Sequence, residues 1–390
     1  MCSGTFLRAS RAGVSPFLFR AIIDSVRRLP ALIFLLLAAA PLRAEPVWQH
    51  VQVPILPEGA ALGPLWSGLS GDLYILARTE KGMPAVPTTY VLHWDREKWR
   101  TDMELPGCEP AAIFGTDEQN MFLAVNRTAP GRAADGGPPK GGRIFRSTDR
   151  GRTWVPQALP EDARGLTLGA MDGSFENVQI LVDRSSLLRF DGVAWSWAFK
   201  GRGGNSDGTM AFAFQGANEG YLVNCQGWGR WINGEWKFMP SDFGFCAANG
   251  LWGLRDRAGE LQLFAVDSHR FTNGLRVWRF NPLLERFDVQ TGEESDDKWG
   301  AAVGIWGSAE DDVYVVGWIG EAEAEGSGRV FHYNGNYWTR DTSMGPIPGP
   351  HGIHGTSRND VWLTLADGRL LHYSTATTLT RKMSTTPTAK

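Results

Sequence analysis

The segment RSTDRGRTWVP, residues 146–156, contains the side chain in this sequence that most invites a catalytic assignment. Asp149 could protonate a leaving group, because a positioned carboxylic acid is a common general acid. An aspartate in a turn has a simpler role, in which its carboxylate accepts hydrogen bonds from the backbone of the same turn. Asp191 stands at the equivalent place in the segment FDGVAW. We therefore interpret Asp149, with Gly151 and Trp154, as a structural turn.

The histidines and cysteines do not have metal-binding spacing. His351 and His354 form an H-x-x-H pair, but on a strand their side chains point to opposite faces. A zinc site also needs a third protein ligand, and the neighbouring sequence offers none. The four cysteines contain no C-x-x-C motif, so neither a zinc nor a redox site is predicted. We expect no metal and no cofactor, apart from weak Ca²⁺ binding by acidic loops.

Composition limits the classes of partner. The 390 residues carry a formal net charge of −3, so the basic footprint of a nucleic-acid-binding protein is missing and we expect no nucleic acid. The chain has 17 Trp and 47 Gly beside only 7 Tyr. Abundant glycine with regularly placed tryptophan is typical of many short strands joined by tight turns.

The N-terminal segment has the features of an export signal. Arg27 and Arg28 precede the apolar run LPALIFLLLAAAPL, and Ala44 is a small residue at a suitable cleavage point. The run is too short for a membrane span, and Arg43 follows it closely. We expect residues 1–44 to be a signal peptide with a doubtful upstream extension. The mature chain is then exported, to the periplasm or outside the cell, and has no membrane span.

An internal repeat determines the predicted fold. The segments IWGSAEDDVYVVGW (from Ile305) and GRVFHYNGNYWTRD (from Gly328) return as IHGTSRNDVWLTLADGRLLHYST (from Ile353). Weaker copies begin near residues 66, 114, 168, 212 and 251. The pattern of the unit is an aromatic-Gly step, an Asp-x-aromatic strand, a His-Tyr strand and a Trp, and it is clearest in the last two units. His93, His332 and His372 share one position of the unit, which indicates a structural role. Seven units of about 49 residues match four-stranded propeller blades.

We therefore predict an all-β fold, a seven-bladed β-propeller of four-stranded antiparallel blades over residues 45–376. The last unit lacks its final strand, and the segment PVWQHVQVP after the cleavage point has Trp48 where that strand should carry its Trp. Closure of the last blade by this N-terminal strand would leave no open sheet edge. The Thr-rich tail, 377–390, has little to bury and is expected to be disordered. We expect a monomer.

Tight turns join the third and fourth strands of most units. Asn-Gly and Asp-Gly between alternating apolar runs are strong hairpin signals. They occur in units three, four and six, each followed by a Trp, and the Asp149 turn takes the same place in unit two. The predicted structural turn residues are Asp149, Gly151, Trp154, Asp191, Asn233 and Asn334.

These units resemble the WGS…DVW…LHYDG…W repeats of bacterial exported β-propellers. Unit two also resembles the Asp-box (BNR) repeat of sialidases and of photosystem assembly-factor propellers. The resemblance covers nearly the whole mature chain, although only units six and seven match closely. It implies the blade and not an activity, because propellers carry many unrelated functions.

A sialidase-like site would need an arginine cluster, a Tyr–Glu nucleophile pair and a carboxylic acid/base. No tyrosine here has a Glu placed by the repeat to activate it, and no three units offer matching arginines. Other glycosidases need only two carboxylates, and the sequence does not identify such a pair. A glycoside hydrolase, or a lectin-like domain of the Asp-box type, therefore stays the alternative to a non-catalytic protein.

The long insertions fall between the second and third strands of a unit, or between units, so we expect them on one face of the ring. Per-repeat insertions often mark the binding face. Basic residues gather in units two to four and acidic ones near unit six, which would steer a charged partner. Candidate partner-binding residues are Arg127, Arg132, Lys140, Arg143, His269, Glu321, Glu323 and Glu325. Trp228, in the Gly-rich segment QGWGR, is a candidate exposed platform for a sugar or a side chain.

One disulfide is predicted on the same face. Cys225 ends a predicted strand of unit four, and Cys246 precedes the first strand of unit five, so the two can meet between neighbouring blades. Cys108 is then the free thiol. Taken together, these features predict a non-catalytic, exported binding or assembly module for a protein or glycan partner.

Overall fold

The computed structural model describes residues 46–81, 86–128, 141–201, 210–225, 227–240, 248–267, 276–292, 300–321 and 324–375. The chain divides into residues 1–44 and 45–390. The predicted signal peptide and the Thr-rich tail lie outside the described residues. Among those that are described, no helix is long and apolar enough to cross a membrane.

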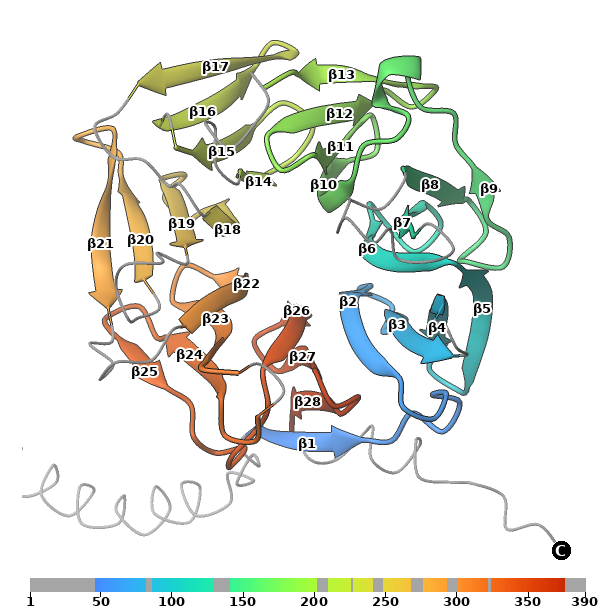
Figure 1. The fold of residues 1–390 in the computed structure, drawn as a ribbon. Helices are drawn as coiled ribbons and strands as arrows, with labels where there is room; N and C mark the ends of the chain where they lie inside the picture. The colour runs from blue at the N-terminus through green and yellow to red at the C-terminus, as the bar shows by residue number, and fades with distance from the viewer. Residues whose placement is uncertain are drawn as a thin grey trace, which may run out of the picture. The chain divides into compact units, whose positions relative to one another are not determined.

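Seven four-stranded antiparallel sheets form a ring of blades, which confirms the predicted fold (Figure 1). The innermost strands are β2 (Ala61–Ser67), β6 (Cys108–Gly115), β10 (Leu168–Ser174), β14 (Ala211–Phe214), β18 (Ala248–Arg255), β22 (Gly300–Ala309) and β26 (Pro350–Ser357). The second strands are β3 (Leu73–Lys81), β7 (Met121–Arg127), β11 (Asn177–Val182), β15 (Gly220–Asn224), β19 (Leu261–Asp267), β23 (Asp312–Ile319) and β27 (Asp360–Leu365).

The third strands are β4 (Val86–Trp94), β8 (Gly142–Ser147), β12 (Ser186–Phe190), β16 (Gly227–Ile232), β20 (Arg276–Asn281), β24 (Gly328–Tyr333) and β28 (Leu370–Ser374). The outermost strands are β5 (Trp99–Pro106), β9 (Val155–Pro156), β13 (Trp195–Phe199), β17 (Glu235–Pro240), β21 (Arg286–Gly292), β25 (Trp338–Arg340) and β1 (Val47–Val51). Blade one is β2–β5, and the blades are numbered from it to blade seven, which is β26–β28 with β1.

The N-terminal strand closes blade seven, as predicted. β1 pairs antiparallel with β28 from Val47 opposite Ser374 to Val51 opposite Leu370. Trp48 packs on Tyr373, with ring centroids 5.3 Å apart, and its indole N–H donates to Asp341 Oδ2 at 2.8 Å. The first and last strands of the chain therefore pair in one sheet, which closes the ring of blades.

Apolar side chains fill the spaces between neighbouring blades. The second strands are the most buried, and every residue of β11 is buried. Between blades two and three, Phe122 and Ala124 of β7 share one core cluster with Val178 and Ile180 of β11. A strand that is buried on both faces has a nearly continuous run of apolar residues, and β11 is mostly apolar for this reason. The blades thus form a packed ring that can hold loops in place.

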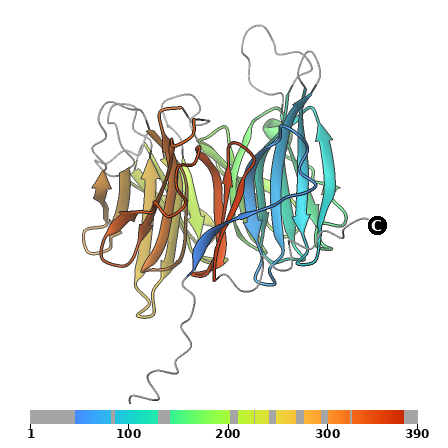
Figure 2. The ribbon, with the colours of Figure 1, turned by 90° about the horizontal axis from the view of Figure 1, so that it is seen from below.

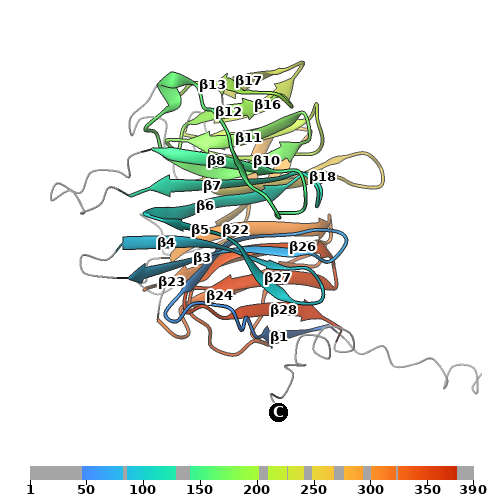
Figure 3. The same cartoon turned by 90° about the vertical axis from the view of Figure 1, so that its right-hand side faces the viewer.

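The connections emerge on two different faces of the ring (Figure 2). Turns between first and second strands, and between third and fourth strands, open on what we call the turn face. Connections between second and third strands, and between blades, open on the opposite, loop-rich face. Seen from the side, the strands of blades one to three run roughly parallel to one another between these faces (Figure 3).

The predicted turn residues lie on the turn face. Asp149 Oδ1 accepts a hydrogen bond from the backbone N–H of Thr153 at 2.9 Å, so its carboxylate caps its own turn. Asp191 Oδ1 accepts from the backbone N–H of Val193 at 2.9 Å, and Asn334 Oδ1 from that of Asn336 at 3.1 Å. Asn233 has a φ of 53°, which a two-residue hairpin turn of this kind requires.

Candidate functional site

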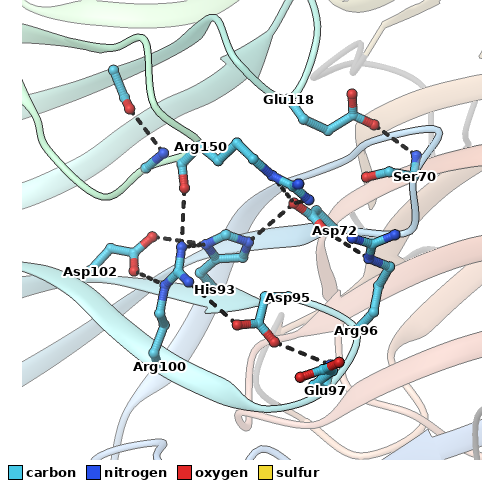
Figure 4. A network of polar contacts seen from close by, with 12 residues as sticks. Ser70, Asp72, His93, Asp95, Arg96, Glu97, Arg100, Asp102, Glu118 and Arg150 are labelled. Carbon is cyan, nitrogen blue, oxygen red and sulfur yellow. Dashed lines mark hydrogen bonds and ion pairs between the residues drawn. The ribbon is translucent and has the colours of Figure 1, made fainter.

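A cluster of buried ionisable side chains lies in blade one, on the side of the turn face (Figure 4). His93 of β4 has its Nδ1 3.0 Å from Asp102 Oδ2 and its Nε2 3.6 Å from Asp72 Oδ2. Its ring stacks on Tyr74, with centroids 3.8 Å apart. The side chains of Asp72, His93 and Asp102 are at most 3% exposed. An aspartate–histidine–tyrosine group of this kind has the composition of an acid–base site.

Arginines from two blades close this cluster. Arg150, in the Asp149 turn of blade two, donates from Nε to Asp72 Oδ2 at 3.1 Å. Arg96 Nε lies 3.3 Å from Asp72 Oδ1. Burial raises the pKa of Asp72, but hydrogen bonds from His93 and Arg150 outweigh burial and bring the pKa to about 2. Asp72 is therefore a carboxylate at neutral pH, held between cations.

The Asp–His pair with its stacked aromatic ring recurs in two other blades without the arginines, which indicates a structural role in the blade. In blade six, His332 Nε2 lies 2.7 Å from Asp312 Oδ1, and its ring stacks on Tyr314. In blade seven, His372 Nε2 lies 2.7 Å from Asp360 Oδ1, and its ring stacks on Trp362. The repeated His position of the sequence thus joins the third strand to the start of the second. In blade one Asp72 and Arg96 also line a cavity of about 320 Å³ that extends to Asp360 and His372 of blade seven.

Trp228 is not an exposed platform, which corrects the sequence prediction. It lies within β16, opposite Val223 of β15, and is 6% exposed. Its ring packs on Phe280 of blade five at 5.0 Å, and its indole N–H donates to the carbonyl oxygen of Glu285 at 3.2 Å. Two flanking glycines suggested a loop, but here they continue the strand, and the tryptophan fills the joint between blades four and five.

The other predicted partner-binding residues that the structure describes lie in blades two and six. Arg127 and Arg143 are exposed at the loop-rich ends of β7 and β8 in blade two. Glu321 is exposed in blade six, and nearby Glu325 Oε2 lies 2.8 Å from Arg369 Nη2. Arg132, Lys140, His269 and Glu323 lie outside the described residues.

The cysteines are described in part. Cys225 is disulfide-bonded, while Cys246 lies outside the described residues, so their pairing stays a prediction. Cys108 is a buried free thiol. Within the described ranges, no three His, Cys, Asp or Glu side chains form a group that could hold a metal ion. Most of the acidic run considered for Ca²⁺ lies outside those ranges.

The open site is the central channel, a cavity of about 570 Å³ between the innermost strands. One equivalent position in each innermost strand lies opposite a second-strand position that is aromatic in six blades and Gln179 in blade three, as Trp66 lies opposite Tyr74. Four of the seven residues at this level are aromatic, and the others are Asp172, Ala213 and His354. The full set is Trp66, Phe114, Asp172, Ala213, Trp252, Trp306 and His354, and all seven line the cavity.

Two polar residues interrupt this aromatic level. Asp172 Oδ2 accepts from the backbone N–H of Phe214 in blade four at 2.9 Å, and burial raises its pKa to about 6. His354 Nδ1 accepts from the backbone N–H of Ser67 in blade one at 3.2 Å. Because a backbone N–H only donates, Nδ1 carries no proton, and the ring proton is on Nε2. Burial, partly opposed by the charge of Asp360, lowers the pKa of His354 to about 4, so this ring is neutral at pH 7.

A second cavity of about 350 Å³ forms the mouth of the channel on the turn face. It shares Trp66, Trp306 and His354 with the channel and adds Leu69, Asp117 and Glu118 at the rim. Leu69 is 89% exposed. Sequence reasoning identified the aromatic-Gly repeat but not this site. The available signal was the replacement of the aromatic residue by Asp172 in unit three and by His354 in unit seven.

Comparisons with known proteins agree on the fold. No family model and no curated protein matches the chain. Among solved structures, one described as YCF48 bound to D1 peptide has a TM-score of 0.54 and 14% identity, covering 86% of this chain and 99% of that one. YCF48 from Cyanidioschyzon merolae has a TM-score of 0.52 and 12% identity, covering 85% of this chain and 100% of that one.

The third comparison is with the extracellular domain of the putative one component system BT4673 from B. thetaiotaomicron. It has a TM-score of 0.54 and 12% identity, and the match covers 83% of this chain and 39% of that one. Likenesses at this level of identity support the β-propeller architecture alone.

Proposed function

We propose that this chain is an exported, non-catalytic β-propeller that binds a protein partner through its loop-rich face. The observation that carries the proposal is a pair of exposed arginines in blade two. Arg127 and Arg143 lie on adjacent strands, and neither forms an ion pair within the described part of the chain.

The strand register supports this pairing, because it puts the two arginines at neighbouring positions on one face of the sheet. Arg143 lies opposite Val125 in the β7–β8 pair, and Arg127 is two residues beyond Val125 on the same face of the strand. Such diagonal neighbours are within reach of each other when their side chains are long. Both also act on one thiol: burial raises the pKa of Cys108, and the positive charges of Arg143 and Arg127 oppose that rise.

Two adjacent arginines without an ion-pair partner among the described residues favour an acidic partner segment. A guanidinium group presents a planar fork of donors that matches a carboxylate in a bidentate way. Exposed charges of this kind mainly raise the association rate, and salt screens them. Supporting this class of function, one structure of similar fold is described as bound to a peptide, and another as an extracellular domain.

Affinity capture with two charge-matched variants tests the proposal. The test variant is Arg127→Gln/Arg143→Gln. The control is Arg152→Gln/Arg257→Gln, which removes two exposed arginines on the turn face. We expect an envelope protein that is captured by the wild type and the control but lost with the test variant. Equal capture by all three proteins would contradict the proposed face.

Two further readouts separate the partner classes. We expect capture to weaken as ionic strength rises, because the contact is between exposed charges. Retention on polysaccharide with slow release of sugar would instead favour the glycoside hydrolase alternative.

A further inference from the structure

The charged groups that line the central channel and its mouth are all carboxylates among the described residues. Asp172 lies in the channel, and Asp117 and Glu118 lie at the mouth, while no described Lys or Arg lines either cavity. Burial raises the pKa of Glu118, but a hydrogen bond from the backbone N–H of Ser70 lowers it below its usual value. The channel therefore has a negative potential that attracts cations.

Asp172 has hydrogen-bond donors but no counter-ion among the residues that the structure describes. Oδ2 accepts from the Phe214 backbone N–H at 2.9 Å and Oδ1 from that of Gly173 at 2.7 Å. An ionised carboxylate has about four acceptor sites, so each oxygen retains capacity. Within the described ranges, the groups that act on Asp172 are the backbone N–H groups of Phe214 and Gly173, and none is a cation. His354 cannot compensate its charge, because this imidazole is neutral at pH 7.

Aromatic rings lie at the same level of the channel as this carboxylate. Phe114, Trp252 and Trp306 are partly exposed there. Trp66 and Trp306 lie next to His354, with their ring centroids 6.2 and 6.3 Å from the centroid of the imidazole. Aromatic faces attract cations through their quadrupole, most strongly where water is excluded. A carboxylate with several aromatic rings suits a cation whose own surface is apolar.

We propose that the central channel binds an organic ammonium ion, with its cationic nitrogen near Asp172 and its alkyl groups against the aromatic level. The cavity, at about 570 Å³, is within the size range of small-molecule sites. A bare metal ion fits the described residues less well, because they offer no group of three ligating side chains. This site is separate from the Arg127–Arg143 pair, so either proposal can fail without the other.

Choline and its uncharged carbon isostere, 3,3-dimethylbutan-1-ol, test the proposal on the purified protein. The two probes share size and shape and differ in charge. By titration calorimetry or quenching of tryptophan fluorescence, we expect choline to bind about tenfold more tightly than the isostere. Equal affinities would overturn the proposal. So would the absence of binding by either probe at about 50 mM, because a millimolar site would then be nearly saturated.

Asp172→Asn tests the residue assignment. Asparagine keeps one acceptor oxygen for the backbone of blade four but removes the charge, and we expect it to abolish the preference for choline. The matched control is Asp191→Asn, an exposed turn residue whose place is taken by Asn233 and Asn334 in other blades. Choline preference that survives in Asp172→Asn would remove Asp172 from the site.

The wild-type protein supplies a second test if Asp172→Asn does not fold. Choline affinity should fall about tenfold between about pH 7.5 and about pH 5, as Asp172 takes up a proton. Of the strands packed against β10, β11 and β14 carry no titratable side chain. β6 and β7 carry Cys108, Glu109 and Arg127 at their loop-rich ends, away from Asp172. Affinity that does not change over this range would contradict the assignment.

Discussion

Trp306 of blade six covers Gly355 of blade seven: a β-carbon on Gly355 would lie 2.7 Å from Cη2 of the indole. The same contact joins Trp66 to Gly115, at 2.7 Å from Cζ2, and Trp252 to Gly307, also at 2.7 Å from Cζ2. The aromatic-Gly repeat of the sequence is therefore a joint between blades. Each large ring needs a residue without a side chain on the next blade.

Gly355→Ala should lower the free energy of unfolding by about 3 kcal/mol, because an added methyl group in a packed joint forces side chains or backbone to move. The backbone oxygen of Asp360 also crowds that position, so the methyl group has no free direction. The matched control is Gly304→Ala on β22, where the nearest atom, a methyl carbon of Ile353, is 3.3 Å away. We expect that change to cost less than about 1 kcal/mol in urea unfolding. Similar losses of stability in both variants would contradict the claim that the Trp306–Gly355 contact is a tightly packed joint between blades.

Two of the three exceptions to the aromatic level, His354 and Asp172, occur where the next blade lacks this glycine, whereas Ala213 precedes a blade that has Gly253. Blade one has Ser67 and blade four has Phe214 at the glycine position. The preceding blades provide His354 and Asp172, each of which accepts a hydrogen bond from that residue's backbone N–H. A smaller hydrogen-bond acceptor, His354 or Asp172, thus replaces the large aromatic side chain where the next blade has a side chain at the glycine position. This relation fixes both residues in the channel wall and leaves the Asp172 charge without a partner among the described residues.

The repeat was enough to predict the fold. Blade number, strand order and closure by Trp48 follow from the periodic placement of aromatic, Gly and Asp residues, because each unit must bury the same faces. The Trp228 prediction was wrong because local glycines do not reveal that a strand continues to a neighbouring blade. The contact of Arg150 with Asp72 was not predicted either, because it joins residues 78 positions apart. The channel site was missed because its signal is a departure from the repeat.

Arg150→Met should destabilise the joint between blades one and two by about 2 kcal/mol, since Asp72 would lose a partner while remaining buried. The loss of stability is smaller than for a buried carboxylate with no cation beside it, because Arg96 Nε stays 3.3 Å from Asp72 Oδ1. Arg152→Met is the control, because Arg152 is exposed in the same turn. Denaturant unfolding measures both variants. Adding Asp72→Asn to Arg150→Met should restore part of the stability, and a further loss instead would show that charge is not the cause.

Trp48→Ala should lower the free energy of unfolding by about 3 kcal/mol, because the closing strand would lose its main packing side chain. Trp48 contacts Tyr314 of blade six and Tyr373 of blade seven, so the loss weakens two blades. Gln52→Ala, an exposed change just after β1, is the control. Thermal unfolding should show a lower Tm for Trp48→Ala only. An unchanged Tm would mean that the N-terminal strand is not needed for closure.

Asp172 and His354 should give opposite pH dependences of stability. The folded-state pKa of His354, about 4, is below its ordinary 6.5, so folding excludes a proton and stability falls as the pH drops from 6.5 toward 4. The folded-state pKa of Asp172, about 6, is above its ordinary 3.8, so the folded protein holds a proton more tightly and stability rises as the pH drops from 6 toward 3.8. In the wild type the two effects partly cancel between pH 7 and pH 5.

Single variants should expose each effect. Between about pH 7 and about pH 5, Asp172→Asn should lose about 2 kcal/mol of stability and His354→Gln should gain about 1 kcal/mol, while the wild type changes less than either variant. Glutamine can still accept the hydrogen bond from the Ser67 backbone, so the joint to blade one is kept. Urea unfolding at the two pH values measures these changes. Slopes of the same sign in both variants would show that groups other than Asp172 and His354 determine the pH response of the fold.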